Sequence, residues 1–456
     1  MRRYLRGGFL ATAACLLVGC SGSAPSAPAP AAVSGAPVEL GADWPAYHRD
    51  AVRSGVSTDM RTPHGLAIVA QPLLDGQVYA SPLVVGKRII VATEGDSVYS
   101  LDETGRQSWR TELGDPSPAG ERACGNIDPL GITGTPVYAN GLIYVSPQYA
   151  GGRHELVALD VNSGAVRWRA GLDLPGVDPL AMQQRGALTV AGGRVWVPFG
   201  GLAGDCGNYK GRLIGVPLGG GKPVQYTVPT SREAGIWTPP GPSVDVNGLL
   251  YVSVGNGESG VGDKYDFSDS VLKLDQSGRL VDSFSPSTWP TDNDADLDLG
   301  SQGPALVGTK WVIIAGKSGS AYVLRQNALG GIGGQVWTGP VCTSYGGSAV
   351  QDDVVYLPCS DGVRAARVAA DGALTVRWKA DDAVAGSPVI GGGRIWALAP
   401  TEGTLHALDP ATGRSTLNIA VGDITRFATP ALSGPLVIVP TKKGITLVRT
   451  DQPERQ

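Results

Sequence analysis

Six cysteines carry the chemistry that can be read most directly from this chain of 456 residues. Cys15 and Cys20 lie close to the N-terminus. The other four are spread over the rest of the chain: Cys124, Cys206, Cys342 and Cys359. No pair has the Cys-x-x-Cys spacing of a zinc or redox-dithiol site. An even number of distant cysteines in an exported chain indicates two disulfides, for which three pairings can be drawn.

The N-terminal residues indicate export. Residues 1–19 join a cationic start to an apolar stretch too short to span a bilayer, as in a signal peptide. The stretch ends in Leu17-Val18-Gly19-Cys20, which resembles the bacterial lipobox, so we expect acylation of the Cys20 thiol. An ordinary signal peptide with an incidental cysteine is the alternative. Residues 20–42 then form the lipidated cysteine and a flexible Ser/Ala/Pro tether, and residues 43–456 the folded domain.

Charge and motif content argue against several classes of protein. Removal of three signal arginines takes the net charge from −4 to −7, which does not indicate a nucleic-acid surface. The 4 histidines lack metal-ligand spacing, and neither a Gly-x-Ser-x-Gly elbow nor a Cys-x-x-Cys-His haem motif is present.

The elements that position these residues follow a repeat. Glycine and proline, together 100 of 456 residues, separate short apolar runs, which favours strands joined by turns over helices. Each unit reads as small residue and proline, strand, glycine turn, strand, loop, a third strand ending in Leu-Asp, and a fourth strand that ends in tryptophan. The third strands include Val98–Asp102, Leu156–Asp160, Val271–Asp275 and Leu405–Asp409.

Eight units begin near residues 79, 133, 186, 238, 300, 345, 386 and 426. Their length, about 40 to 60 residues, is typical of a four-stranded propeller blade. The last unit supplies three strands, and Leu66–Ala70 could add the fourth and remove both sheet edges. We therefore predict an all-β, eight-bladed propeller of four-stranded antiparallel blades closed by an N-terminal strand, with seven blades as the alternative. Seven of the 10 tryptophans fit this register, whereas three do not: Trp44, Trp237 and Trp289.

Two segments resemble a known superfamily. Val98–Trp109 is similar to the tryptophan-docking repeat of quinoprotein (PQQ) dehydrogenase-like β-propellers, and Asp43–Gly55 to the segment that precedes the propeller there. The same repeat serves dehydrogenases and barrel-assembly scaffold lipoproteins, so the resemblance implies the fold more firmly than the function.

The resemblance also implies positions for a quinone site. Gly235–Gly257 resembles the stretch that carries the tryptophan beneath PQQ and an asparagine ligand of calcium, which fall on Trp237 and Asn256. The aspartate that acts as base would fall on Asp296 or Asp298.

Further positions complete or weaken this assignment. Lys317 matches a basic position beside the quinone, and only Asp205 could replace a third calcium ligand, giving Asn256, Asp205 and Asp296 as the metal set. However, the adjacent cysteine pair that caps the cofactor in many members is absent. The acidic run 292–296 lacks the glycine and glutamate of an EF-hand, so we expect a solvated loop there.

Strand alternation places the unusual segments on one face. The loop that enters the first strand and the loop that joins strands two and three open on the same side of every blade. All four distant cysteines fall in such loops, and because the start of strand one meets the end of strand two, Cys342–Cys359 is the favoured disulfide. Cys124–Cys206 follows by elimination. The long insertions 146–154, 200–210, 256–269 and 287–298 share this looped face, where we expect binding.

Three functions remain. The first is a membrane-anchored, extracytoplasmic PQQ-like propeller without redox activity that binds an envelope protein, a polymer or a small ligand. The second is a calcium- and PQQ-dependent dehydrogenase of alcohols or a hydroxylated polymer. The third is an outer-membrane barrel-assembly scaffold lipoprotein. We expect a monomer at the outer face of the cytoplasmic membrane, or in the periplasm or outer membrane of a two-membrane cell.

Overall fold

The computed structural model describes residues 40–172, 176–381 and 383–450. The expected signal peptide, Cys20 and the expected tether up to residue 39 lie outside the described residues. Strands dominate the described chain, and none of its helices is long and apolar enough to cross a membrane.

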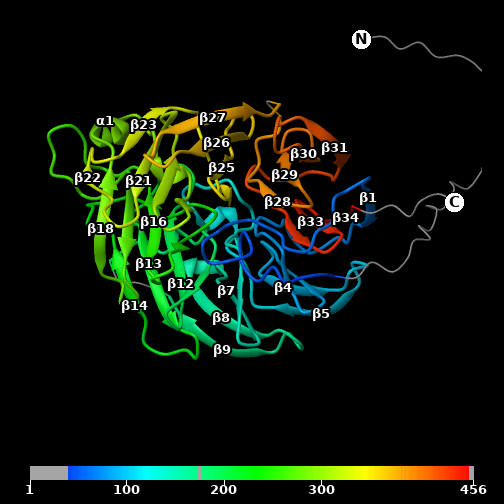
Figure 1. The fold of residues 1–456 in the computed structure, drawn as a ribbon. Helices are drawn as coiled ribbons and strands as arrows, with labels where there is room; N and C mark the ends of the chain where they lie inside the picture. Colours follow the sequence, from blue (N-terminus) through cyan, green and yellow to red (C-terminus); the bar gives the residue numbers. More distant parts are fainter. Residues whose placement is uncertain (1–39, 173–175, 382, 451–456) are drawn as a thin grey trace, which may run out of the picture. The chain divides into compact units, whose positions relative to one another are not determined.

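Eight antiparallel sheets follow one another around a ring and form its blades (Figure 1). The first two are blade 1, β2 (Leu83–Val85), β3 (Arg88–Ala92), β4 (Ser97–Leu101) and β5 (Gln107–Glu112), and blade 2, β6 (Val137–Ala139), β7 (Leu142–Val145), β8 (Glu155–Asp160) and β9 (Val166–Gly171). Blade 3 contains β11 (Thr189–Ala191), β12 (Arg194–Gly201), β13 (Arg212–Pro217) and β14 (Val224–Thr227), and blade 4 contains β15 (Ser243–Val244), β16 (Leu250–Val254), β17 (Ser270–Leu274) and β18 (Leu280–Ser285).

The second half of the ring repeats this order. Blade 5 contains β19 (Ala305–Val307), β20 (Trp311–Ala315), β21 (Ser320–Arg325) and β23 (Trp337–Pro340), and blade 6 contains β24 (Ala349–Gln351), β25 (Val354–Leu357), β26 (Arg364–Val368) and β27 (Leu374–Lys379). Blade 7 contains β28 (Val389–Gly391), β29 (Arg394–Ala399), β30 (Thr404–Leu408) and β31 (Ser415–Ala420), and blade 8 contains β32 (Ala431–Ser433), β33 (Leu436–Thr441), β34 (Gly444–Arg449) and β1 (Ala67–Ala70).

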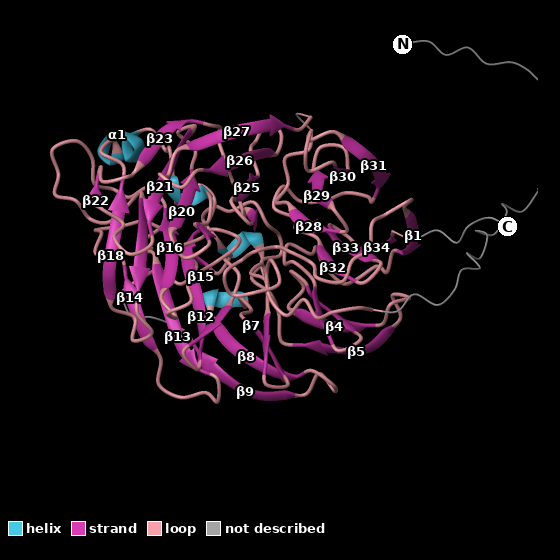
Figure 2. Cartoon of the chain, viewed as in Figure 1, coloured by secondary structure: helices cyan, strands magenta, loops and turns pink. Residues whose placement is uncertain are grey.

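The predicted eight blades and the closure of the ring are confirmed, and the seven-blade alternative is wrong. Strand β1 pairs antiparallel with β34, with Ala67 opposite Arg449 and Ile68 opposite Val448. Two blades carry an additional short strand: β10 (Met182–Gln183) pairs with β12, and β22 (Gly331–Ile332) pairs parallel with β18. Figure 2 shows the few helices, which are α1 (Trp289–Asp294), η1 (Ala119–Glu121), η2 (Ala150–Gly152) and η3 (Leu299–Ser301).

Two contacts explain the recurring residues of the repeat. The aspartate after a third strand caps the following turn, as Asp160 Oδ1 accepts the backbone N–H groups of Asn162 and Ser163, both at 3.0 Å. The fourth-strand tryptophan then docks on the next blade, where Trp109 Nε1 donates to Val161 O at 3.2 Å. A Cβ on Gly164 would lie 2.5 Å from the Trp109 ring, so only glycine fits there.

One detail of the repeat differs from prediction. Trp337 begins its fourth strand, β23, and Trp109 lies within β5, because the strands continue beyond the expected tryptophan end.

Residues 43–59, which we call the plug, cross the middle of the ring (dark blue in Figure 1). They exchange backbone hydrogen bonds with the first strands of five blades. The bonded pairs are Trp44 with Val84, Pro45 with Tyr138, Ala51 with Val244, Ser54 with Val350, and Gly55 and Ser57 with Ile390. The first strand is the innermost of each blade, so the plug closes the ring axis.

Side chains extend the plug to two further blades. The buried Arg53 guanidinium donates to Tyr47 O at 3.0 Å within the plug, and to Leu188 O at 3.1 Å and Thr189 Oγ1 in blade 3. Asp59 accepts the N–H of Gly434 in blade 8 at 3.1 Å. Seven of the eight blades therefore contact this one segment directly.

Replacing Arg53→Met should destabilise the ring, because it leaves the carbonyls of Tyr47 and Leu188 buried without donors. We expect the free energy of unfolding to fall by about 3 kcal/mol in urea denaturation. Arg61→Met, at an exposed arginine just after the plug, is the matched control and should change it by less than about 0.5 kcal/mol. Equal effects of the two variants would contradict the role of Arg53.

Candidate functional site

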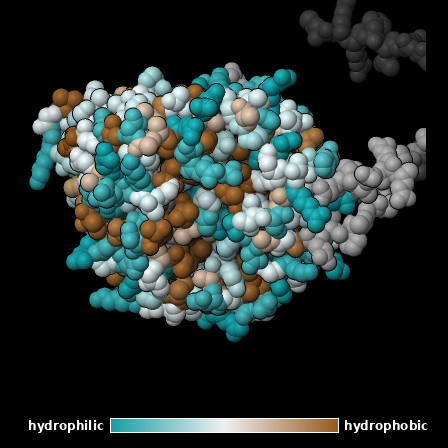
Figure 3. Space-filling model, in the orientation of Figure 1, coloured by the Kyte–Doolittle hydropathy of each residue, from teal (hydrophilic) through white to brown (hydrophobic). Residues whose placement is uncertain are grey.

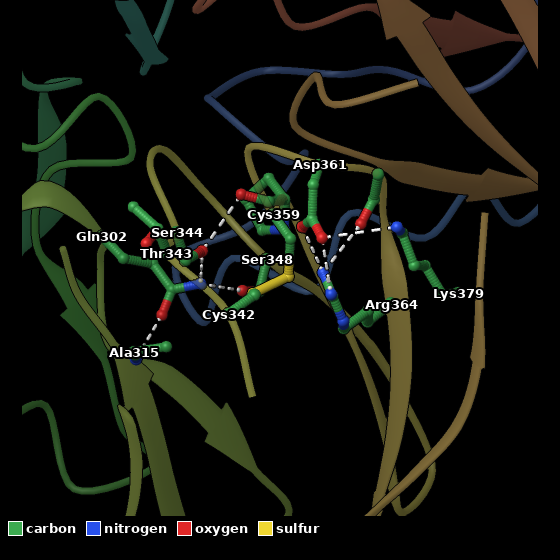
Figure 4. Close-up of a disulfide and its surroundings, with 12 residues drawn as sticks. Gln302, Ala315, Cys342, Thr343, Ser344, Ser348, Cys359, Asp361, Arg364 and Lys379 are labelled. Atoms are coloured by element: carbon green, nitrogen blue, oxygen red, sulfur yellow. Dashed lines mark hydrogen bonds and ion pairs between the residues drawn. A yellow bond between two sulfur atoms is a disulfide. The ribbon is translucent and has the colours of Figure 1, made fainter. Parts of the chain in front are cut away.

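Both predicted disulfides are confirmed, and both lie on the looped face. Cys124–Cys206 joins the segment entering blade 2 to the loop between strands two and three of blade 3, and Cys342–Cys359 lies within blade 6. Beside the second bond, the buried Gln302 side chain donates to Ser344 Oγ at 2.8 Å and Ser348 Oγ at 3.0 Å (Figure 4). Gln302 Oε1 accepts the N–H of Ala315 at 2.6 Å, so this network ties blade 6 to blade 5. The looped face is thus fixed covalently and by buried polar contacts.

All the residues that the resemblance assigned to a quinone site line one cavity of about 260 Å³ on the looped face. They come from the loops of blades 3, 4 and 5: Asp205, Trp237, Asn256, Asp296, Asp298 and Lys317. Arg185 and residues 201–204 complete the wall. Residues up to 112 positions apart in the sequence therefore meet in space, as the resemblance implies.

Glycines determine how closely Trp237 packs. A Cβ on Gly200 would lie 2.7 Å from the Trp237 Cβ, and one on Gly255 would lie 2.9 Å from its Nε1. Both strand ends can approach the indole only because these residues have no side chain. The half-buried indole is therefore held firmly at the cavity wall.

Asp298 is the most deeply buried charge of this cavity, at 2% exposure. Its Oδ1 accepts the backbone N–H of Asn256 at 2.6 Å, and its Oδ2 is ion-paired with Lys317 Nζ. Burial raises the pKa of Asp298 above its usual range, and Lys317 opposes the increase. Burial also disfavours the Lys317 cation, but Asp298 and Asp296 outweigh it and raise the pKa of Lys317. The lysine is therefore charged at neutral pH.

The same ion pairs decide whether the cavity could bind a calcium ion. Lys317 Nζ contacts Asp296 Oδ1 at 2.7 Å as well as Asp298, so an ammonium group already occupies the position between these carboxylates. Asp205 Oδ1 accepts the hydroxyl of Tyr209. The side-chain oxygens of Asn256, Asp205 and Asp296 that remain without a partner are fewer than the six to eight oxygen ligands that calcium takes. The donor set as arranged does not fit a calcium ion, and the metal assignment to Asn256, Asp205 and Asp296 stays a prediction.

Sequence analysis missed two arginines near the ring axis. Arg185 stacks over the Phe427 ring at 4.0 Å, and Arg426 stacks over the Tyr345 ring at 3.9 Å. Neither guanidinium has a hydrogen bond or ion pair with any residue the structure describes. Arg426 and Tyr345 line a second cavity, of about 350 Å³, between blades 6, 7 and 8. Both arginines lie in segments entering a first strand, a position that strand alternation assigns to the looped face.

The acidic run 292–296 is not the solvated loop that we expected. Its first half belongs to helix α1, in which Asp292 and Asn293 are buried. Asn293 Oδ1 accepts the N–H of Gly257 at 2.9 Å, and its Nδ2 donates to Ser259 O at 2.6 Å. The helix therefore supports the 256–269 loop, because its polar side chains satisfy backbone groups that the irregular loop leaves unpaired.

Comparison with known proteins adds a family to this geometry. A family model described as outer membrane protein assembly factor BamB matches residues 62–127 and 129–374. No curated protein matches the sequence. BamB from Moraxella catarrhalis superposes with a TM-score of 0.58 at 17% identity, over 84% of this chain and 99% of that chain. The computationally designed Ika8 protein gives a TM-score of 0.53 at 12% identity, over 86% and 99% of the two chains. At these identities the two structures share the fold alone with this chain.

Lys317→Met should destabilise the protein more at pH 8 than at pH 5. The pKa of Asp298 is already raised in the folded state, so the folded protein loses stability as the pH rises through this pKa. Removal of the Lys317 cation raises the pKa of Asp298 further and enlarges that loss. We expect roughly 3 kcal/mol less stability at pH 8 in urea unfolding, and clearly less of a loss at pH 5. Lys222→Met, at an exposed lysine without a partner among the described residues, should show neither effect.

Proposed function

The chain belongs to the family of the outer membrane protein assembly factor BamB, whose model matches more than half of the sequence, and we propose that it acts as an envelope scaffold that binds a partner protein on its looped face. The observation that carries the proposal is the form of that face. The plug closes the ring axis, and Arg185 and Arg426 are stacked on aromatic rings next to two of the cavities on the looped face. This arrangement suits a rigid docking surface.

The stacked arginines favour a protein partner. Stacking holds the plane of each guanidinium and leaves its N–H edge available, and such arginines, with tyrosine, are typical of interface hot spots. Burial lowers the pKa of Arg185 to about 10, which still keeps it charged at neutral pH. Polar and apolar residues are interspersed over the visible surface (Figure 3), and strongly exposed apolar side chains such as Leu73 and Val246 lie far apart in sequence. Recognition would thus depend on the axial arginines rather than on a large apolar patch.

The place of action is part of the same proposal. Lipidation of Cys20, with residues 20–42 as tether and residues 43–456 as the propeller, would hold the scaffold at a membrane surface outside the cytoplasm. The two disulfides support an oxidising compartment.

The partner is tested by site-specific photo-crosslinking in the native host, with the crosslinker placed at Tyr345 on the looped face or at Arg61 on the opposite side. We expect one envelope protein to be captured from Tyr345 and not from Arg61. The double variant Arg185→Ala/Arg426→Ala should reduce its yield about tenfold or more, whereas Arg61→Ala should not. Undiminished capture by the double variant would refute a docking role for these arginines.

A PQQ-dependent dehydrogenase is the second candidate, favoured only by the convergence of Trp237, Asn256, Asp298 and Lys317 in one cavity. PQQ with calcium can be titrated into the mature protein while tryptophan fluorescence and dye-linked oxidation of alcohols are followed. Because Lys317 neutralises the carboxylates, we expect neither quenching nor turnover at micromolar quinone. Tight binding that Trp237→Ala abolishes, together with turnover, would favour the dehydrogenase over the scaffold.

A further inference from the structure

A second group of polar side chains lies between blades 1 and 2, outside the cavity described above. Six buried residues there have side-chain atoms without a hydrogen-bond partner among the described residues: Glu94, Asp96, Ser117, Thr133, Ser146 and Gln148. None is more than 4% exposed. A buried polar atom without a partner costs about 1–3 kcal/mol, so this concentration of such atoms calls for a ligand.

Two carboxylates of this group approach the same residue, Gly131. Glu94 Oε2 accepts the Gly131 N–H at 2.7 Å, while Glu94 Oε1 has no partner. Neither oxygen of Asp96 has a partner, and a Cβ on Gly131 would lie 2.7 Å from Asp96 Oδ1. The backbone of Asp96 is fixed, with φ at 54° and its carbonyl bonded to the N–H of Leu113 at 2.9 Å. The two carboxyl groups are thus held against one residue, with three free oxygens.

Neutral polar side chains without partners lie on the segments that adjoin Gly131. Ser146 and Gln148 follow β7 two residues apart, and their side chains therefore share one side of an extended segment. Ser117 is tied to this segment, because its N–H donates to Gln148 O at 3.2 Å and to Leu130 O at 2.9 Å. The Oγ of Ser117, the Oγ of Ser146 and both polar atoms of the Gln148 amide lack partners. Gln148 supplies the observation that is independent of the acidic pair, since an amide at 1% exposure gains nothing from burial without a ligand.

The charges nearby do not neutralise Asp96. Burial raises its pKa to about 9, Glu94 and Asp75 raise it further, and the nearby backbone N–H of Gln148 and the Arg153 cation oppose the increase. Burial likewise raises the pKa of Glu94 to about 7, against the weaker effects of the Gly131 N–H, the Thr133 hydroxyl and the cations Arg185 and Arg122. Two carboxyl groups, an amide and hydroxyls are hard oxygen donors, the set that calcium prefers.

We propose that Asp96, Glu94 and Gln148, with the hydroxyls of Ser117 and Ser146, form a calcium-binding site that joins blade 1 to blade 2. The site shares no residue with the quinone-like cavity and does not depend on the scaffold function. Bound calcium would satisfy the free oxygens and connect the two blades where the segment to Cys124 begins.

Calcium binding is measured on the mature protein after chelation with EGTA and dialysis. We expect one equivalent of calcium by equilibrium dialysis, and a rise of about 3 °C in Tm at a calcium concentration a hundredfold above Kd. Asp96→Asn should abolish both the calcium uptake and the calcium-dependent rise in Tm. A merely structural aspartate would leave both in place.

Two further variants locate the ion. Glu94→Gln should weaken calcium binding at least tenfold. This variant tests the same site if Asp96→Asn folds poorly. Asp296→Asn, at the quinone-like cavity, should leave the calcium affinity unchanged. A protein that takes up no calcium at 1 mM would show a water-filled site only and overturn the proposal, as would binding that Asp296→Asn abolishes and Asp96→Asn does not.

Discussion

The ring depends on one constraint: the innermost strands must be joined at the axis. Eight blades leave their first strands facing a common centre, where backbone groups would otherwise lack partners. The plug supplies these partners through hydrogen bonds from residues 44–59 to blades 1, 2, 4, 6 and 7, and through side chains to blades 3 and 8. The closure between β1 and β34 completes the outer circuit. With the axis closed, both cavities on the looped face become recesses rather than passages.

The site on the looped face follows from short-range electrostatics. Lys317 lies between two carboxylates, one of them buried, and the backbone N–H of Asn256 completes the bonding of Asp298. Carboxylates that are already paired are stable, but they present little unsatisfied chemistry to a substrate. The stacked arginines differ, because their guanidinium groups have no hydrogen bond or ion pair with any described residue. This contrast favours binding over catalysis on the same face.

The repeat could be predicted because its causes are local. Asp160 caps its turn within three residues, and Gly164 and Gly413 receive Trp109 and Trp378 of the preceding blades in the same way, so both features leave a periodic trace. The plug has no period, since each of its residues meets a different blade, and only its resemblance to a known segment marked it. The meeting of Trp237 with Lys317 was likewise implied by resemblance. The stacking of Arg185 on Phe427 could not be predicted, because the contacts of this guanidinium depend on loops that lie far away in the sequence.

The order of elements at the N-terminus has a mechanical consequence. The described chain starts at Leu40, which is buried against the core of blades 7, 8 and 1, then forms the plug, and only afterwards reaches β1. A pull on a tether at this end would be transmitted to the plug before it reached the β1–β34 pair. The load would reach the contacts of the plug one after another, starting with Trp44 on blade 1. The closing strand would be loaded only after these contacts had yielded.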